Sequence, residues 1–206
     1  MFNFKVIKAL LFDLGGVVIE IDFDRVFNSW SKYSSLSRKQ ITDSFYFDVM
    51  YEQHERGEIE SHVYYNHVRS TFNLTATNEQ IELGWNKIFS GEIKSVVKQI
   101  DKIKSKINCY AFTNTNAAHQ SAWELCCPNV TPLFQRIFSS CNLGYRKPDS
   151  AAFHTVLSLM QVDKNEVLFF DDTEENIIAA KNLGIQAQLV KNPSDVLNIL
   201  VQFSNF

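Results

Sequence analysis

Several polar residues come directly after short apolar runs, where the end of a buried strand can present a side chain to a crevice. Asp13 follows the apolar run 9–12 and precedes Gly15 and Gly16. An aspartate before glycines is also common turn chemistry, so Asp13 alone does not distinguish a turn from a site. Three more polar clusters favour the site. They are Thr113 with Asn114, Lys147, and Asp171 with Asp172.

These side chains are of the types that phosphoryl transfer uses. An aspartate can attack phosphorus and form an acyl phosphate, so Asp13 is the expected nucleophile, with a role as a base as the alternative. A hydroxyl, an amide and an ammonium group can stabilise phosphate oxygens, which makes Thr113, Asn114 and Lys147 the expected phosphate-binding residues. Magnesium prefers oxygen ligands. The expected ligands are the carboxylates of Asp13, Asp171 and Asp172 and the main-chain carbonyl of Gly15.

Each cluster also has an ordinary structural interpretation. Thr113 and Asn114 could cap a helix, Lys147 could be a solvated loop residue, and an acidic pair is favourable at a helix N-terminus. All of these coincidences would have to occur together, in an order that completes a phosphate and metal site. We therefore interpret the clusters as one site.

The elements that would position these residues alternate between short apolar runs and helical periodicity, which is typical of a parallel sheet covered by helices. The expected strands are 5–12, 107–112, 136–139 and 167–170. The expected helices are 93–106, one through Ala122 and Leu125, one with Pro148 in its first turn, and one over 174–183 that Thr173 caps and Gly184 closes. The sequence thus predicts an α/β fold with a Rossmann-like parallel sheet flanked by helices.

The stretch from about Asp22 to Ser90 interrupts this alternation. It predicts amphipathic helices over 24–33, 39–56, 61–72 and 78–89, and no strand. A helical block inserted after the first strand would lie over the carboxyl end of that strand, as a lid over Asp13. A helical domain unrelated to the site is the alternative.

The composition excludes several classes of partner. The chain is 45% hydrophobic and 21% charged with a formal net charge of -3, and its Lys and Arg residues form no basic stripe, so no nucleic acid is expected. No run approaches membrane-spanning length and the start lacks a signal-peptide pattern. Four cysteines show neither zinc spacing nor a disulfide framework, which indicates reduced thiols in a cytoplasm. They are Cys109, Cys126, Cys127 and Cys141.

The order of the polar motifs resembles the haloacid dehalogenase (HAD) superfamily of aspartate-dependent phosphohydrolases. The resemblance covers about residues 5–20 and 93–190. It rests on Phe12-Asp13-Leu14-Gly15-Gly16-Val17, Thr113 with Asn114, Gly144-Tyr145-Arg146-Lys147-Pro148-Asp149, and Asp171-Asp172-Thr173-Glu174-Glu175-Asn176. It implies a HAD-like core formed by residues 1–20 and 91–206, a helical cap of the first type formed by 21–90, Mg2+ as cofactor, and a phospho-aspartate intermediate on Asp13.

One position departs from the pattern of the superfamily's phosphatases. They usually carry a second aspartate two residues after the nucleophile, as general acid and base, and this chain has Gly15 there. The chain is similar to a subgroup that includes an α-D-glucose-1-phosphate phosphatase, which shares Asp-Leu-Gly and a stretch like 21–23. An anomeric leaving group needs less protonation than an ordinary alcohol. Asp22, Asp24 or an ordered water are the expected partial substitutes.

Substrate choice is expected to depend on the lid. His54, Glu55 and Arg56 stand where a lid helix ends, and their polar side chains could bind a sugar. Alternatively, Arg56 and Gly57 simply end that helix. A lid over a small crevice favours a small-molecule phosphomonoester, and the subgroup implies a sugar phosphate such as glucose 1-phosphate.

Three functions follow from these patterns. The first is a magnesium-dependent phosphatase that acts through Asp13. The second is a catalytically silent binding or regulatory protein that lost its acid at Gly15, although the retention of Asp13 and Lys147 argues against it. The third is a phosphoryl-accepting receiver, which the order of the acidic residues disfavours. A dehalogenase is also compatible with the fold, but that chemistry has no use for the metal that the acidic pair implies.

Overall fold

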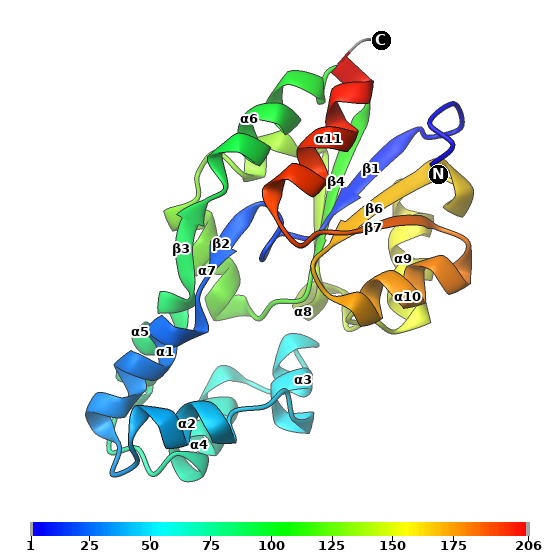
Figure 1. Cartoon of the computed structure of the whole chain (residues 1–206). Coiled ribbons are helices and arrows are strands. Elements are labelled where there is room, and N and C mark those ends of the chain that lie inside the picture. Colours follow the sequence, from blue (N-terminus) through cyan, green and yellow to red (C-terminus); the bar gives the residue numbers. More distant parts are fainter. Residues whose placement is uncertain (1, 205–206) are drawn as a thin grey trace.

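The centre of the molecule is a five-stranded parallel sheet in the order β5-β4-β1-β6-β7, as the computed structural model of residues 2–204 shows (Figure 1). Strand β1 (Ala9–Phe12) lies between β4 (Asn108–Thr113) and β6 (Val167–Asp171). Strands β5 (Arg136–Ser139) and β7 (Gln186–Leu189) form the edges. The expected α/β fold is confirmed.

Both faces of the sheet are covered by helices, which explains why β1 is apolar throughout. Successive residues of β1 point to opposite faces. Leu10 and Phe12 pack with apolar residues of the helices on one face, and Ala9 and Leu11 pack with those on the other. The first face carries α6 (Lys94–Ile103), α7 (Ala117–Cys126) and α11 (Pro193–Ser204), and the second carries α9 (Ser150–Met160) and α10 (Glu174–Leu183).

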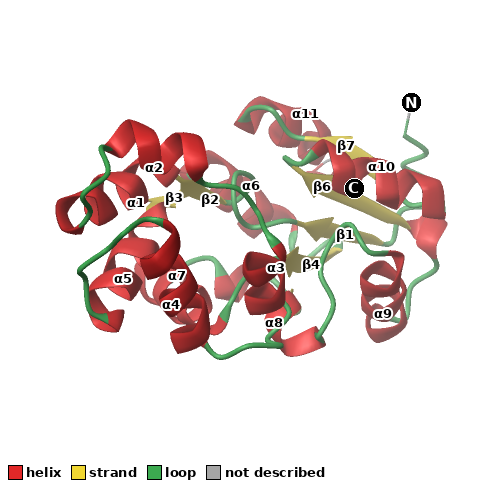
Figure 2. Cartoon of the chain, turned by 90° about the horizontal axis from the view of Figure 1, so that it is seen from below, coloured by secondary structure: helices red, strands yellow, loops and turns green. Residues whose placement is uncertain are grey.

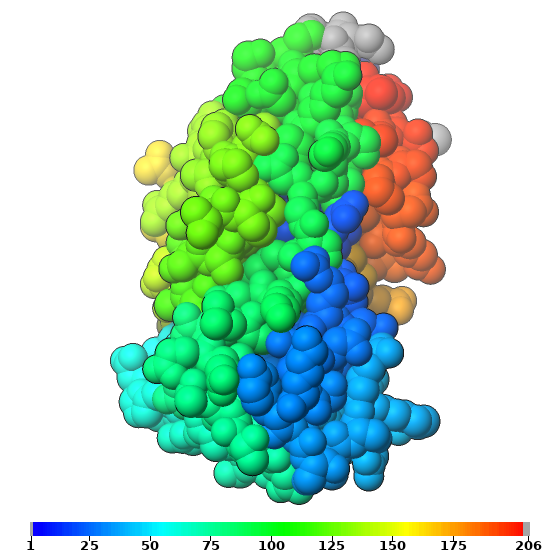
Figure 3. Space-filling view, turned by 90° about the vertical axis from the view of Figure 1, so that its left-hand side faces the viewer, coloured from blue at the N-terminus to red at the C-terminus, as the bar shows by residue number. Residues whose placement is uncertain are grey.

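The helical insertion after β1 has an apolar cluster of its own, in which the stacked rings of Trp30 and Trp85 lie 5.3 Å apart. Figure 3 shows it as the blue, cyan and blue-green end of the molecule. Its elements are α1 (Phe23–Trp30), a 3-10 turn (Ser31–Tyr33), α2 (Arg38–Ser44), α3 (Val49–Glu55), α4 (Ser61–Thr71), α5 (Asn78–Trp85) and a second 3-10 turn (Asn86–Ile88).

Two expectations for the insertion were wrong. The expected helix 39–56 is two helices, because the chain is extended at Phe45 and the carboxylate of Asp48 caps α3 by accepting from the amide of Tyr51 at 2.8 Å. A strand also occurs where none was expected. Strand β3 (Phe89–Glu92) pairs antiparallel with β2 (Ile19–Ile21), so the two ends of the insertion leave the core side by side.

Pro148 does not open a helix as expected. Helix α9 begins at Ser150, with Asp149 as its N-cap, and Pro148 belongs to the loop that carries Lys147. This loop follows the short helix α8 (Ser140–Leu143), which lies beside α3 of the insertion (Figure 2). None of the helices within residues 2–204 has the length and apolar character needed to cross a membrane.

Candidate active site

A cavity of about 480 Å³ lies at the carboxyl edge of the sheet, with walls from both the core and the helical insertion. The strand register brings the polar clusters to this edge. Phe12 pairs with Phe170, and the amide of Asp13 donates to the Phe170 carbonyl at 2.8 Å, so Asp13 and Asp171 stand at neighbouring strand ends. Thr113 ends β4 on the other side of β1. The structure thus brings together side chains that are up to 159 residues apart in the sequence.

Lys147 is the most deeply buried charge at the site, with its residue 1% exposed. Its Nζ lies 2.6 Å from Asp171 Oδ2 and 3.1 Å from Asp13 Oδ1. Burial lowers the pKa of Lys147, but the two carboxylates outweigh this effect and raise the pKa above its ordinary value. Lys147 is therefore a fixed positive charge beside Asp13, and the alternative of a solvated loop lysine is wrong.

The two acidic residues at the end of β6, Asp171 in the strand and Asp172 directly after it, have different surroundings. Asp171 is fully buried, and both of its oxygens have partners: the amide of Thr173 donates to Oδ1 at 2.8 Å, and Asn176 Nδ2 lies within 3.1 Å of either oxygen. Asp172 is exposed, and its carboxylate accepts one long hydrogen bond, from Thr173 Oγ1 to Oδ1 at 3.4 Å. Asp172 is thus free to bind a ligand, whereas Asp171 holds Lys147 in place.

Asp13 combines a constrained oxygen with a free one. Oδ1 accepts from the amide of Leu14 at 2.7 Å and faces Lys147, while Oδ2 has no hydrogen-bond partner among residues 2–204. Burial raises the pKa of Asp13 to about 8; Lys147 opposes this, and the nearby Asp171 and Asp172 add to it. A cation at this point would favour the ionised form.

The donor set for a metal fits magnesium. One carboxylate oxygen from each of Asp13, Asp171 and Asp172 lies within 4.8 Å of the others, and oxygen ligands are what this hard cation prefers. The raised pKa of Asp13 is consistent with a site that is completed by positive charge. The residues present therefore fit the ion.

Asn114 has a role that the sequence did not reveal. Its side chain donates to the carbonyl of Lys147 at 2.8 Å and accepts from the amide of Lys147 at 2.9 Å. This pair of bonds fixes the main chain of the lysine loop, so the Asn114 side chain is not available to a phosphate. Thr113 is buried at the end of β4 and lines the cavity.

Gly15 and Gly16 shape the loop after Asp13. A side chain at Gly15 would first meet Ile21 at 3.6 Å, so an aliphatic group lies next to the position of the missing acid. Gly16 has φ +70°, and a Cβ there would come 2.1 Å from Asp172 Oδ2. Only glycine allows Asp172 to approach this loop so closely.

The expected substitutes for the acid have other roles. Asp22 caps α1 by accepting from the amide of Asp24 at 2.9 Å, and Asp24 pairs with Arg38 at 2.6 Å. Neither carboxylate lines the cavity. The structure therefore gives no support to Asp22 or Asp24 as a proton donor.

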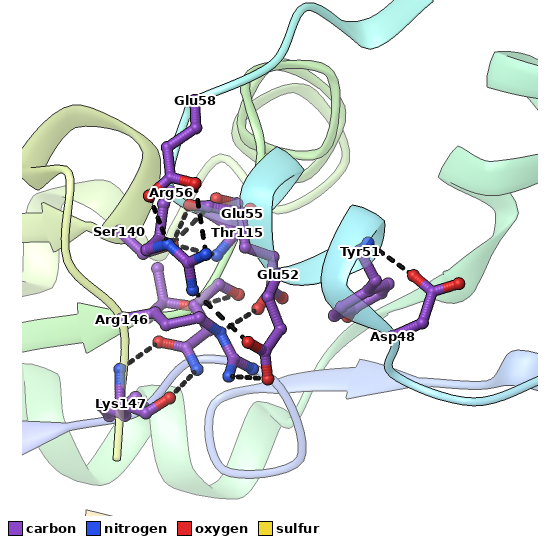
Figure 4. Close-up of polar contacts among 12 residues, drawn as sticks. Asp48, Tyr51, Glu52, Glu55, Arg56, Glu58, Thr115, Ser140, Arg146 and Lys147 are labelled. Carbon is purple, nitrogen blue, oxygen red and sulfur yellow. Dashed lines mark hydrogen bonds and ion pairs between the residues drawn. The ribbon is translucent and has the colours of Figure 1, made fainter. Parts of the chain in front are cut away.

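On the lid side, the structure brings Glu55 to the cavity but not His54 or Arg56. His54 is buried against Tyr64 and its Nε2 lies 3.1 Å from Ser61 Oγ, while Arg56 pairs with Glu58. Sequence reasoning missed three residues of this wall: Tyr51, Glu52 and Arg146. Figure 4 shows Glu52 and Glu55 of α3 beside Arg146, next to Lys147.

Comparisons with known proteins found relatives that match most of the chain. Residues 7–184 match the model of the haloacid dehalogenase-like hydrolase family. The chain is 24% identical to the D-ribitol-5-phosphate phosphatase of Bacteroides thetaiotaomicron, over 92% of this chain and 94% of that protein. It is 27% identical to the sesquiterpene phosphatase astK of Aspergillus oryzae, over 86% and 87% of the two chains.

A solved structure of similar fold contains the ligands that the site suggests. The HAD family enzyme BT-2542 from Bacteroides thetaiotaomicron, in complex with magnesium and inorganic phosphate, has a TM-score of 0.77 and 28% identity. The match covers 90% of this chain and 94% of that chain.

Proposed function

The chain belongs to the haloacid dehalogenase-like hydrolase family, and from this premise we propose that it is a magnesium-dependent phosphatase of a small sugar or polyol phosphate. The observation that carries the proposal is the contact of buried Lys147 with both Asp13 and Asp171 beside the exposed Asp172. The similarity to a D-ribitol-5-phosphate phosphatase supports a hydroxylated substrate. Residues 21–90 act as its cap.

The roles of the residues follow from their surroundings. Asp13 attacks the phosphorus through Oδ2, the bond from phosphorus to the leaving oxygen breaks, and that oxygen takes a proton from solvent water. A second water then attacks the phosphorus and loses its proton to solvent, and the bond from phosphorus to Asp13 breaks, which restores the carboxylate and releases phosphate. Lys147 and Thr113 stabilise the phosphate oxygens, and the main-chain N–H of Asn114 replaces its side chain in this role.

Magnesium, when bound, neutralises charge on the phosphate oxygens. Asp13, Asp172 and the Gly15 carbonyl would hold it directly. Asp171, whose oxygens are taken by Lys147, Thr173 and Asn176, would act by fixing Lys147 and the adjacent turn.

The glycine at position 15 restricts which leaving groups depart readily. An alkoxide that leaves without a proton donor is costly, whereas an anomeric oxygen is a better leaving group. Glucose 1-phosphate and similar anomeric phosphates are therefore the proposed preferred substrates, ahead of phosphates on primary alcohols.

The test is phosphate release from p-nitrophenyl phosphate, glucose 1-phosphate, glucose 6-phosphate and ribitol 5-phosphate, with magnesium and with a chelator. Asp13→Asn should lower kcat by about a thousandfold or more, because the nucleophile is lost. Asp22→Asn is the matched control, since Asp22 caps α1 outside the cavity, and should leave kcat within about threefold. Magnesium-independent release, or an active Asp13→Asn protein, would contradict the mechanism. No release from any ester would favour a silent binding protein.

A further inference from the structure

The lid end of the cavity carries a compact group of charges that the proposed phosphoryl transfer does not use. Glu52 and Glu55 come from successive turns of the same face of α3, and Arg146 comes from the core loop just before Lys147. We call these three residues the carboxylate–arginine cluster. Because all three line the cavity, they face the part of a substrate that lies away from Asp13.

Arg146 is held in one orientation by the two carboxylates. Its Nε donates to Glu55 Oε2 at 2.9 Å and its Nη1 donates to Glu52 Oε1 at 3.1 Å. Its Nη2 has no hydrogen-bond partner among the described residues, and the side chain is 14% exposed. A rigid guanidinium group with a free N–H edge is well suited to donate to an oxygen atom of a ligand.

The two carboxylates differ in freedom. The side chain of Glu55 is 6% exposed and accepts from Arg146 Nε at 2.9 Å, so it is a fixed part of the wall. Glu52 is 36% exposed. Its second oxygen, Oε2, makes a long contact of 3.4 Å with Arg56, which pairs more closely with Glu58 at 2.6 Å. Glu52 can therefore accept a hydrogen bond from a ligand.

The charge balance of this wall decides what it can bind. Arg146 is the cation of the cluster and faces the carboxylates of Glu52 and Glu55. Arg56, also near Glu52, is paired with Glu58 outside the cavity, and a third carboxylate, Glu175, lines the cavity. A second anionic group on a substrate would lose its hydration and meet a surplus of negative charge. A hydroxyl group would instead donate to a carboxylate and accept from Arg146.

We propose that the carboxylate–arginine cluster is a specificity subsite that binds the uncharged, hydroxylated part of the leaving group and excludes monoesters that carry a second anionic group. This inference rests on the proposed phosphatase function. It adds that the enzyme selects among phosphomonoesters by the charge of the part beyond the phosphate. Excluded substrates would include sugar bisphosphates and phosphorylated sugar acids.

A matched pair of substrates isolates the effect. Glucitol 6-phosphate and 6-phosphogluconate share their carbon chain and phosphate, and differ in a terminal hydroxymethyl group against a carboxylate. The unmodified enzyme should have a kcat/KM at least about tenfold higher for glucitol 6-phosphate. p-Nitrophenyl phosphate, which has no hydroxyls for the subsite, serves as the measure of chemistry at Asp13.

Glu52→Gln is the decisive variant, because it removes the more exposed carboxylate with little change of shape. It should reduce the ratio of the two kcat/KM values about threefold to tenfold, through a gain with 6-phosphogluconate, when each value is expressed relative to that of the same protein for p-nitrophenyl phosphate. Glu58→Gln is the control. Glu58 lies three residues beyond the end of α3, pairs with Arg56 and does not line the cavity, so the preference should not change.

Two results would overturn the subsite: equal kcat/KM for the matched pair, or the same preference in the Glu52→Gln and Glu58→Gln proteins. Calorimetric binding of both phosphates to the Asp13→Asn protein, with magnesium, gives the same ratio without turnover. If p-nitrophenyl phosphate is not hydrolysed, the phosphatase function fails, and the binding ratio still decides whether the cluster selects by charge.

Discussion

At the scale of single residues, the site differs from the expected pattern at one position. Gly15, two residues after Asp13, stands where an acid was expected. The position is accessible from the cavity, since Gly15 lines it and Ile21 is the nearest side chain to a Cβ there. A contact of 3.6 Å is ordinary van der Waals distance, so a larger side chain can be accommodated by a small shift of Ile21. The lost group can therefore be restored experimentally.

Gly15→Asp should raise kcat/KM for glucose 6-phosphate about tenfold or more, because a proton donor assists an alkoxide leaving group. It should change the value for p-nitrophenyl phosphate little, since that leaving group needs no proton. Steady-state kinetics with both esters measure the difference. Gly15→Asn has a similar size without the acid and serves as control; a rise in both variants would contradict the explanation.

The residues that follow strands could be predicted because their positions depend on local pattern alone. Asp13, Thr113, Lys147 and the acidic pair each follow an apolar segment or stand in a loop beside it, and parallel strands place such ends at one edge. The different roles of Asp171 and Asp172 could not be predicted, since they depend on which carboxylate meets Lys147.

At the scale of elements, the apolar strands β1, β4, β5 and β6 were predictable. The edge strand β7, in which two of the four residues are glutamines, was not, and neither were the paired β2 and β3. Both are short, and β3 has partly exposed residues and a glycine, so neither shows a strand pattern. The lid residues Tyr51, Glu52 and Arg146 escaped prediction for a related reason. Which face of α3 lines the cavity depends on how the helix docks on the core, and Ser140 fixes this by donating to the Glu55 carbonyl at 2.6 Å.

The conformation of the turn after β1 should affect both magnesium binding and stability. Gly16→Ala should reduce magnesium affinity about tenfold or more and destabilise the fold by about 1–2 kcal/mol, because the new Cβ displaces Asp172 and strains a residue with positive φ. Titration calorimetry with magnesium and denaturant unfolding measure the two effects.

Gly144→Ala separates strain from displacement. Gly144 has φ +74° with nothing within 4 Å of a Cβ, so its substitution should cost stability alone and leave magnesium affinity unchanged. Equal magnesium affinity in the Gly16→Ala protein would show that Asp172 is not a ligand.

At the scale of the whole molecule, two buried histidines near the junction of insertion and core make stability depend on pH. Burial lowers the pKa of His54 to about 4; burial, together with His54, lowers that of His119 to about 3, below the ordinary value of 6.5. Below about pH 6.5 the unfolded chain binds protons that the folded chain does not, so these histidines make the free energy of unfolding decrease as the pH is lowered. The raised pKa of Asp13 acts in the opposite direction.

His119→Phe isolates the contribution of His119 to the pH dependence of the free energy of unfolding. Between pH 7 and pH 5.5 the variant should lose about 1 kcal/mol less stability than the parent, since the contribution of Asp13 is common to both. Denaturant unfolding at each pH measures the difference. Parallel pH profiles for the two proteins would contradict a neutral, buried His119.

Because β2 pairs antiparallel with β3, the two ends of the insertion lie side by side, and the segment between them could be replaced by another. Ile21 and Phe89 are cross-strand partners, so the chain leaves and re-enters the core at points one strand spacing apart, about 5 Å. Any segment whose ends meet at that spacing, from a tight turn to a different helical bundle, could be spliced there without moving the Asp13 loop. Replacement of the insertion would therefore exchange Glu52 and Glu55, the part of the carboxylate–arginine cluster that α3 carries, while Arg146 and the strand ends with Asp13, Thr113 and Asp171 stay with the core.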